Sequence, residues 1–513
     1  MIDCYDPATG EPLGQVRVTP PNAVAGAVAR GREAAERWAK STFGDRRALL
    51  QRMLEFTLQD ADALCDDIVR DSGKTRENAM YGEIWPVCAK LDWTIAHGAR
   101  HLRPEPVSSG LLVHKRARIE FAPLGVVGVI TPWNYPFQNI MGPTIHALMA
   151  GNAVVIKVSE WVAWSSARFT RVFDAALDAV GYPRDLVQII QGYGPTGQAL
   201  VESGVDKVVF TGSMENGRRV LQASVKNLTP VILELGGKDP LIVCDDAALE
   251  QAVNAALNGV FINCGQNCLA AERILVHRGI YAAFEQQIVG RVGTFRQGPP
   301  RGPEIVDVGA IVSPLQLDRI DALVQEAVKE GARVLLGAKR TSSEQGQYYA
   351  PTVLAGVRPH MRIMHEEVFG PVMLLCRVED DAEAIRVANS TPYALGSTVM
   401  SRSPARARAI HEQLVTGSSV VNDFGLAYIA QDLPFGGVRG SGFGRLNGRD
   451  GLRAMTNPKA VLEDRLPFHR PLRLYPTHAG DYARGREMIR ALYGRGGTRR
   501  RAVWELLRKS GVG

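Results

Sequence analysis

The sequence predicts an α/β protein built on two parallel-sheet domains, and two observations support this prediction. Short runs rich in Val and Ile, each followed by a turn or a polar residue, alternate with helical stretches and lie at 125–131, 153–158, 208–212 and 240–246. Strands that alternate with helices are typical of parallel sheets, which bind ligands at the carboxyl ends of their strands. A second alternating series runs from about 270 to 430, which predicts a second α/β domain in this chain of 513 residues.

The segment before the first apolar run predicts helices followed by an exposed strand. Residues 22–40, 45–71 and 75–100 have the spacing of apolar residues that is expected of amphipathic helices. Residues 111–121 alternate apolar and basic side chains, which is typical of a strand with one face in solvent. We therefore expect this strand to stand apart from the buried strands that follow it.

Positive charge is concentrated at the end of the chain. Residues 465–513 contain twelve Arg and Lys against three acidic residues, a net charge of +9, whereas the whole chain carries +7. The preceding 464 residues therefore carry a net charge of −2. Because the basic residues belong to the tail, the sequence gives no reason to expect the body to bind nucleic acid.

The seven cysteines indicate a reduced protein. They are scattered, odd in number and without CxxC spacing, so neither a disulfide framework nor a metal site is expected. The chain has no apolar run long enough for a transmembrane helix, and it begins without the basic-then-apolar pattern of a signal peptide. We therefore expect a cytoplasmic protein.

The motif FINCGQNCLAAER, residues 261–273, is the strongest chemical signal. Gly265 and Gln266 precede Cys268 and leave an open backbone approach to its thiol, as a cysteine nucleophile requires. The alternative is that Cys268 is only a small buried apolar residue. Cys264 could compete for the role of nucleophile, but it lacks the pattern that follows Cys268.

Two further motifs hold groups suited to acyl chemistry. ILELGGKDP, residues 232–240, places Glu234 at the end of an apolar run, where a partly buried carboxylate can act as a general base. PWNYPF, residues 132–137, places the Asn134 amide directly after a predicted strand, where it could donate to an oxyanion. Taken singly, each motif has a structural alternative: an ion-paired or helix-capping glutamate, and an asparagine turn packed with aromatic residues.

Two more motifs follow predicted strands and are suited to a nucleotide. Lys157 and Glu160 end the run GNAVVIKVSE, where the lysine could meet ribose or phosphate and the glutamate could accept ribose hydroxyls. Gly212 and Ser213 lie between a strand and an expected helix, whose first backbone N–H groups suit a pyrophosphate. The motif around Gly212 and Ser213 does not match GxGxxG, and a surface ion pair is the alternative for the first motif.

Two loop motifs complete the pattern. HEEVFGPV, residues 365–372, places two acidic residues before an aromatic residue and a Gly-Pro turn. LPFGGVRGSGFGR, residues 433–445, contains five glycines, which imply close backbone packing or a wall beside a ligand. A loop without a function is the alternative for each motif.

In their order and spacing, these seven segments resemble the aldehyde dehydrogenase superfamily over about residues 1–465. The resemblance implies that Cys268 is the nucleophile and Glu234 the general base, and that the Asn134 amide and the Cys268 backbone N–H form the oxyanion hole. The implied reaction is the oxidation of a small-molecule aldehyde to a carboxylic acid through a thioester on Cys268. Tyr135 and Phe435 would line the substrate tunnel.

The same resemblance implies NAD as the cofactor, with NADP as the alternative. Lys157 and Glu160 would hold the adenosine ribose, and Gly212 and Ser213 would meet the pyrophosphate. The resemblance gives no metal ion a role in the reaction.

At the other end of the implied cofactor site, Glu367 would bind the nicotinamide ribose. Phe369 would pack against the nicotinamide, and Trp133 would line the same cleft.

The resemblance also implies a domain organisation. Residues 1–103 and 124–235 would form an NAD-binding domain, and residues 236–445 a catalytic domain. Residues 104–123 and 446–464 would form a small oligomerisation β-flap, followed by the basic tail at 465–513. A homodimer or homotetramer is therefore expected.

Three segments look like a plant and fungal branch of the superfamily that carries a C-terminal extension: NDFGLAYIAQDLPFGG, SGFGRLNGRDGLRA and LEDRLPFHRPLRLYP. The chain departs from many superfamily members at one position, where Leu446 replaces the glutamate that follows the final Gly-Arg. A proton relay through that glutamate is therefore unavailable here.

Three other functions compete with this interpretation. A CoA-acylating dehydrogenase would use Cys268 but often lacks the base, so Glu234 argues against it. A thioesterase or cysteine hydrolase would need no nucleotide, and the paired nucleotide motifs argue against it. A non-enzymatic nucleotide-binding scaffold is disfavoured because every principal catalytic residue type is present.

The tail has two alternative roles. Its segments 481–494 and 499–509 place aromatic and aliphatic residues among arginines. Helices of this kind can lie on an anionic membrane, which would give the protein a peripheral membrane contact. Alternatively, the apolar residues dock on the enzyme body or on a partner subunit, with the arginines in solvent.

Overall fold

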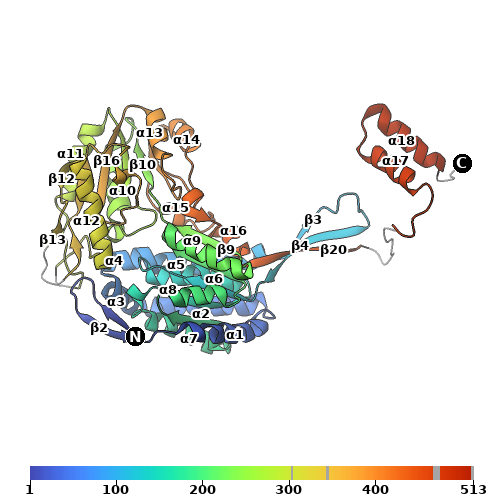
Figure 1. Cartoon of the computed structure of the whole chain (residues 1–513), viewed down its shortest axis with the longest axis horizontal. Coiled ribbons are helices and arrows are strands. Elements are labelled where there is room, and N and C mark those ends of the chain that lie inside the picture. The colour runs from blue at the N-terminus through green and yellow to red at the C-terminus, as the bar shows by residue number, and fades with distance from the viewer. Residues whose placement is uncertain (302–303, 342–345, 466–473, 510–513) are drawn as a thin grey trace. The chain divides into compact units, whose positions relative to one another are not determined.

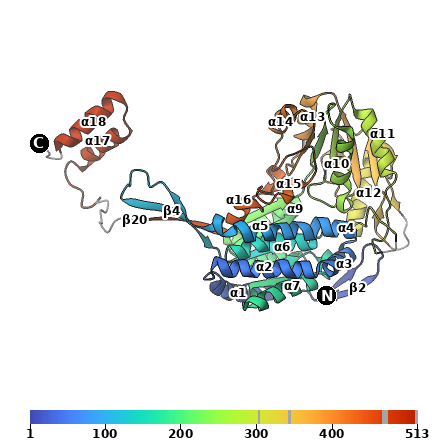
Figure 2. The ribbon, with the colours of Figure 1, turned by 180° about the vertical axis from the view of Figure 1, so that it is seen from behind.

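The structure, a computed structural model, describes residues 1–301, 304–341, 346–465 and 474–509. Internal contacts divide the chain into two units, the first made of residues 1–105 and 119–460 and the second of residues 106–118 and 461–513. Both α/β sheets lie in the first unit. In Figures 1 and 2, the elements of one sheet gather in the lower half of this unit and those of the other sheet in the upper half.

The first sheet has six strands in the order β19-β9-β8-β5-β6-β7. Its pairs are parallel except that β19, at one edge, runs antiparallel to β9. The chain changes direction along the sheet between β5 and β8, which makes a switch point where open α/β sheets bind ligands. The strands are β5 (Val126–Ile130), β6 (Ala153–Val158), β7 (Val187–Gln191), β8 (Lys207–Gly212), β9 (Val231–Leu235) and β19 (Gly442–Phe443).

The second sheet has seven strands in the order β12-β15-β16-β11-β10-β17-β18. Again all pairs are parallel except one at an edge, between β12 and β15. The strands are β10 (Pro240–Val243), β11 (Arg273–His277), β12 (Arg333–Leu336), β15 (Thr352–Ala355), β16 (Val372–Val378), β17 (Thr398–Met400) and β18 (Val420–Val421). The predicted fold class, α/β with two mainly parallel sheets, is confirmed.

Helices cover both sheets. Around the first sheet they are α1 (Pro21–Trp38), α2 (Phe43–Gln59), α3 (Ala61–Ser72), α4 (Arg76–Ala79), α5 (Trp85–Leu102), α6 (Pro136–Met149), α7 (Ser166–Val180), α8 (Gly194–Glu202), α9 (Met214–Ser224) and α16 (Gly448–Arg453). Around the second they are α10 (Leu249–Phe261), α11 (Tyr281–Val292), α12 (Pro314–Lys329), α13 (Asp381–Ala388), α14 (Pro404–His411) and α15 (Leu426–Ile429). A turn of π-helix, η1 (Met80–Ile84), joins α4 to α5.

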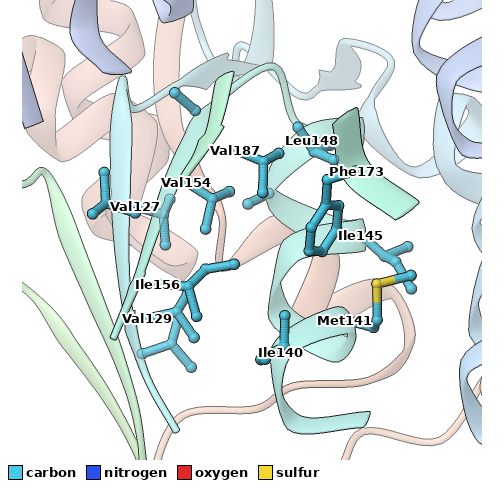
Figure 3. Close-up of a cluster of buried hydrophobic side chains, with 14 of the residues drawn as sticks. Val127, Val129, Ile140, Met141, Ile145, Leu148, Val154, Ile156, Phe173 and Val187 are labelled. Carbon is cyan, nitrogen blue, oxygen red and sulfur yellow. The ribbon is translucent and has the colours of Figure 1, made fainter. Parts of the chain in front are cut away.

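The packing around the first sheet explains why the sequences of its strands are continuous apolar runs. Every residue of β5 and β6 is buried, because helices cover both faces of a parallel sheet. Figure 3 shows side chains of the two strands packed against side chains of two helices: Val127 and Val129 of β5, Val154 and Ile156 of β6, Ile140, Met141, Ile145 and Leu148 of α6, and Phe173 of α7. This rigid layer fixes the carboxyl ends of the strands, where the candidate site lies.

The predicted exposed strand is β4 (Lys115–Pro123), the middle strand of a three-stranded sheet with β3 (Glu105–Val107) and β20 (Thr456–Asp464). Lys115 pairs with Asp464 at 2.5 Å, and Arg118 pairs with Glu463 at 2.7 Å. These opposite charges across the strands explain how a sheet with almost no fully buried residue can hold its register.

In the tail, the two predicted amphipathic segments form helices α17 (Asp481–Tyr493) and α18 (Gly496–Lys509). Glu487 of α17 is buried and accepts hydrogen bonds from Arg486 and Arg490. None of the helices in the described ranges combines the length and hydropathy that a membrane span requires.

Candidate active site

The three predicted catalytic residues come from three separate parts of the fold and line one cavity of about 580 Å³. Asn134 follows β5, Glu234 lies in β9, and Cys268 lies between α10 and β11. The two predicted tunnel residues, Tyr135 and Phe435, line the same cavity. The fold therefore brings together residues that are far apart in sequence and that belong to both sheets.

Glu234 and Cys268 lie next to each other in the lining of this cavity. Glu234 is 2% exposed, and burial raises its pKa to about 8, while a hydrogen bond with Cys268 opposes that rise. Burial and the neighbouring Glu234 carboxylate raise the pKa of the Cys268 thiol well above its usual range. Both groups are therefore mainly protonated at neutral pH. Once the Glu234 carboxyl group has lost its own proton, the carboxylate is placed to accept the proton of the Cys268 thiol.

The Asn134 side chain is buried beside the Cys268 loop. Its Nδ2 donates to the Gln266 carbonyl at 3.2 Å, and its Oδ1 accepts from Asn139 Nδ2 at 3.2 Å. Its backbone carbonyl accepts from Asn263 Nδ2 at 2.9 Å. An amide held in this way is a preorganised donor, which costs little reorganisation when negative charge develops nearby.

A buried ion pair makes hydrogen bonds to the turn that contains Asn134. Lys74 Nζ and Glu83 Oε1 lie 2.6 Å apart with both side chains fully buried, and Lys74 also donates to the Asn134 carbonyl at 2.7 Å. Glu83 Oε2 accepts the backbone N–H of Phe137 at 2.7 Å, at the first turn of α6. The pair therefore fixes the chain at the Asn134 carbonyl and at Phe137, three residues further on.

Sequence reasoning did not find Lys74 and Glu83. Their partners lie about 50 to 60 residues away in the chain, and no local pattern reveals such a pairing. The π-helical turn that carries Glu83 also passes close to Tyr135, since a side chain at Gly82 would meet the Tyr135 ring at 2.8 Å.

The loop that leads into Cys268 has an unusual backbone. Asn263 and Cys264 both have positive φ, at 51° and 57°. The Gln266 side chain anchors the loop by accepting from the Val312 N–H at 2.9 Å and donating to the Ala310 carbonyl at 3.1 Å. Cys264 is 2% exposed and packs in the apolar core of the second sheet, while Cys268 faces the cavity.

The motif at 365–372 forms the loop between β15 and β16. Glu367 is buried and accepts from the Gly237 N–H at 3.0 Å, and burial raises its pKa to about 8. The Phe369 ring contacts the Trp133 ring edge-on at 5.3 Å. The predicted nicotinamide-side residues Glu367, Phe369 and Trp133 thus come from both halves of the unit.

Glu272 holds this loop in place and was also missed from the sequence. Its carboxylate accepts the backbone N–H groups of Val368 and Phe369 at 2.8 to 3.0 Å and pairs with the buried Lys238 ammonium. Phe369 has a positive φ of 53°, which costs energy in a residue other than glycine. The two bonds from Glu272 stabilise that conformation.

Lys157 and Glu160 line a second cavity of about 710 Å³ beside α8 and α9. Lys157 Nζ lies 3.4 Å from Glu160 Oε2. Gly212 ends β8, and Ser213 caps α9 by accepting the Asn216 N–H at 3.3 Å. Four of the predicted cofactor residues therefore lie at the carboxyl ends of β6 and β8.

Comparison with known proteins places the chain in a family. The model of the aldehyde dehydrogenase family matches residues 1–461, so the chain belongs to that family. A putative aldehyde dehydrogenase-like protein of Schizosaccharomyces pombe is 36% identical over 469 residues, which cover 90% of each chain. The 4,4'-diapolycopene aldehyde oxidase of a Methylomonas species is 35% identical over 496 residues, which cover 96% of this chain and 91% of the relative.

Solved structures agree with this assignment. Betaine aldehyde dehydrogenase from Staphylococcus aureus, crystallised with NAD⁺, superposes with a TM-score of 0.86 at 30% identity and covers 93% of each chain. An aldehyde dehydrogenase from Bacillus cereus, also in complex with NAD⁺, gives a TM-score of 0.85 at 30% identity and covers 90% of this chain and 93% of that chain. The protein is an aldehyde dehydrogenase by family and by fold, and hence an oxidoreductase.

Proposed function

We propose that the protein oxidises an aldehyde to a carboxylic acid with NAD⁺, through a thioester on Cys268 that is hydrolysed with Glu234 as base. The observation that carries the proposal is the meeting of Asn134, Glu234 and Cys268 on one cavity. An aldehyde panel followed by NADH absorbance tests it. A purified enzyme that forms no NADH with any aldehyde would refute the proposal.

Each residue has a chemical task in this reaction. The Cys268 thiolate attacks the aldehyde carbon, and the Asn134 amide donates to the oxyanion that forms. Bound NAD⁺ supplies the hydride acceptor. Loss of hydride leaves an acyl group on Cys268, and Glu234 then removes a proton from the water that hydrolyses it.

The second cavity has the composition that an adenosine moiety needs. Apolar side chains of α8 and α9, among them Val201 and Val220, form its walls, and Lys157 and Glu160 supply polar groups at the end of β6. Lys157 and Glu160 would hold the ribose hydroxyls, and the N-terminus of α9 would face the pyrophosphate. The Staphylococcus aureus and Bacillus cereus enzymes, both crystallised with NAD⁺, support NAD⁺ as the cofactor.

We expect a preference for NAD⁺ over NADP⁺ of at least about tenfold in kcat/KM. The Glu160 carboxylate would repel a 2′-phosphate, and the nearby cations Arg219 and Lys226 are already paired with Glu215 and Glu202. Initial rates with each cofactor measure the preference. Glu160→Gln should narrow it, and equal efficiencies in the unmodified enzyme would contradict it.

We also expect the protein to be at least a dimer. The strands β3 and β20 form the two edges of the three-stranded sheet, and Leu111, Leu112 and Val113 in the segment before β4 are exposed. Open strand edges and exposed apolar residues favour pairing with a second copy. Light scattering at micromolar concentration measures the mass, and a monomer would be the contrary result.

For the tail, we expect contact with anionic lipid. Apolar residues of α17 such as Ile489 and Tyr493 are exposed, as is Trp504 of α18, in a segment of net charge +9. The chain should sediment with anionic liposomes at low salt and be released at high salt, because salt screens the attraction. A chain ending at Asp464 is the control. Absence of sedimentation with anionic liposomes at low salt would favour docking on protein instead.

A further inference from the structure

The cavity that holds Cys268 continues outward to a rim of exposed apolar side chains. Four large apolar residues line its outer part and are each exposed in the first unit: Tyr81 (63%), Trp85 (46%), Ile305 (68%) and Leu426 (47%). They come from three separate segments: η1 with the start of α5, the loop before α12, and α15. Tyr81 and Trp85 contact each other edge-on, with ring centroids 6.3 Å apart. Exposed apolar residues that gather at one opening mark a binding surface rather than chance.

Aromatic walls connect this rim to the reacting groups. Tyr428 and Phe435 form an edge-on pair at 4.8 Å, and Phe261 and Phe295 form another at 5.3 Å, all four within the cavity lining. Such walls offer large apolar contact area without fixed hydrogen-bonding demands. A chain of carbon atoms bound along them would bury its surface from Cys268 outward.

Few charged side chains lie in the cavity lining between Cys268 and the four exposed apolar residues. Besides Glu234, the charged lining residues are Glu77, Lys90 and Asp307, of which Glu77 and Asp307 are exposed at the surface and Asp307 pairs with Arg296. The Lys90 ammonium is buried and donates to the Leu446 carbonyl at 2.9 Å and to Asn447 at 2.7 Å, and burial lowers its pKa to about 7.

Leu446 itself lines the cavity and adds an apolar side chain to its wall.

We propose that the substrate is a long apolar aldehyde, whose alkyl or polyene chain runs along the aromatic walls and whose far end rests on Tyr81, Trp85, Ile305 and Leu426. This inference rests on the proposed oxidation at Cys268 and adds the class of aldehyde. A long apolar substrate accounts for the exposure of these four residues in the free enzyme. A short aldehyde would not reach them, whereas a chain that fills the cavity would cover them.

The test is a series of straight-chain aldehydes from propanal to decanal. We expect kcat/KM to rise by roughly threefold for each added methylene group until the chain passes the rim, since each buried methylene is stabilised by transfer out of water. A flat series, or one that falls with length, would overturn the inference while leaving the proposed oxidation standing.

Variants of the rim test the residues. The double variant Tyr81→Ala with Trp85→Ala should lower the ratio of kcat/KM for decanal to that for propanal by about tenfold. Tyr5→Ala is the matched control, because Tyr5 is 55% exposed and lies outside the cavity lining, and its ratio should equal that of the unmodified enzyme. A ratio unchanged in the double variant would remove Tyr81 and Trp85 from substrate binding.

A binding measurement separates the two proposals if no aldehyde is oxidised. Titration calorimetry on the full chain measures the affinity of the cavity for decanoate and for butyrate, and it needs no turnover. Tighter binding of decanoate, weakened in the double variant, supports the apolar site even if the proposed oxidation fails. Equal affinity for the two acids would contradict the inference whatever the activity.

Discussion

Replacement of Cys268 by alanine should abolish aldehyde oxidation and leave NAD⁺ binding intact. The expected loss in kcat is at least about 10⁴-fold, because the variant removes the atom that forms the covalent bond. NAD⁺ binding should survive because the second cavity, with Lys157 and Glu160, includes neither Cys268 nor its neighbours. NADH absorbance measures the first result, and a fluorescence titration with the nucleotide measures the second.

Cys264→Ala is the matched control for this experiment. Cys264 is buried in the core of the second sheet and does not line the cavity, so its removal should leave most of the activity. If Cys268→Ala kept its turnover while Cys264→Ala lost it, the assignment of the nucleophile would be wrong.

Glu234→Gln should stop the reaction after the first turnover. The amide cannot take a proton from water, so the acyl group should remain on Cys268. Because Glu234 is also placed to accept the thiol proton, hydride transfer should survive only in part. We expect a slowed burst of NADH of at most about one equivalent per site, followed by a steady rate far below that of the unmodified enzyme. Stopped-flow absorbance measures the burst, and a steady rate equal to that of the unmodified enzyme would remove Glu234 from the role of base.

The deacylation rate of the unmodified enzyme should increase with pH if Glu234 is the base. Burial raises the pKa of Glu234 to about 8, so the carboxylate is the minor form below that pH. Deacylation should therefore be slow at pH 6, rise through pH 8 and level off above it. In Glu234→Gln this rise should disappear from the deacylation rate.

The architecture could be predicted from the sequence because parallel strands are buried on both faces. The run predicted at 153–158 coincides with β6, and the one at 125–131 contains β5, since helices cover both strands completely. The segment predicted as one helix at 75–100 is instead α4, a π-helical turn and α5. Within that turn Gly82 lies against the Tyr135 ring, a long-range contact that local spacing cannot reveal.

The antiparallel edge strand β19 shows the same limit. Its five-glycine motif predicts close backbone packing, and a side chain at Gly442 would lie 2.1 Å from the Leu233 carbonyl oxygen. The motif does not say which strand it approaches. The pairing of Gly442 with Glu234 therefore had to come from the structure.

For the candidate site, the sequence predicts the residues with distinctive chemistry but not those that hold them. Asn134, Glu234 and Cys268 each stand in a motif of their own. Lys74 and Glu272 act by long-range bonds to backbone groups, and such bonds leave no local pattern. Residue type predicts candidate reacting groups, whereas the residues that support them are seen only in the fold.

The thioester on Cys268 is the central claim, and mass spectrometry of Glu234→Gln after mixing with NAD⁺ and decanal tests it most directly. The account predicts a protein heavier by one decanoyl group, with the added mass on the peptide that contains Cys268. Hydroxylamine should release the group, and omission of NAD⁺ should prevent its formation. A decanoyl group on Cys264, or decanoic acid formed by Glu234→Gln at the full rate with no acylated protein, would contradict the account.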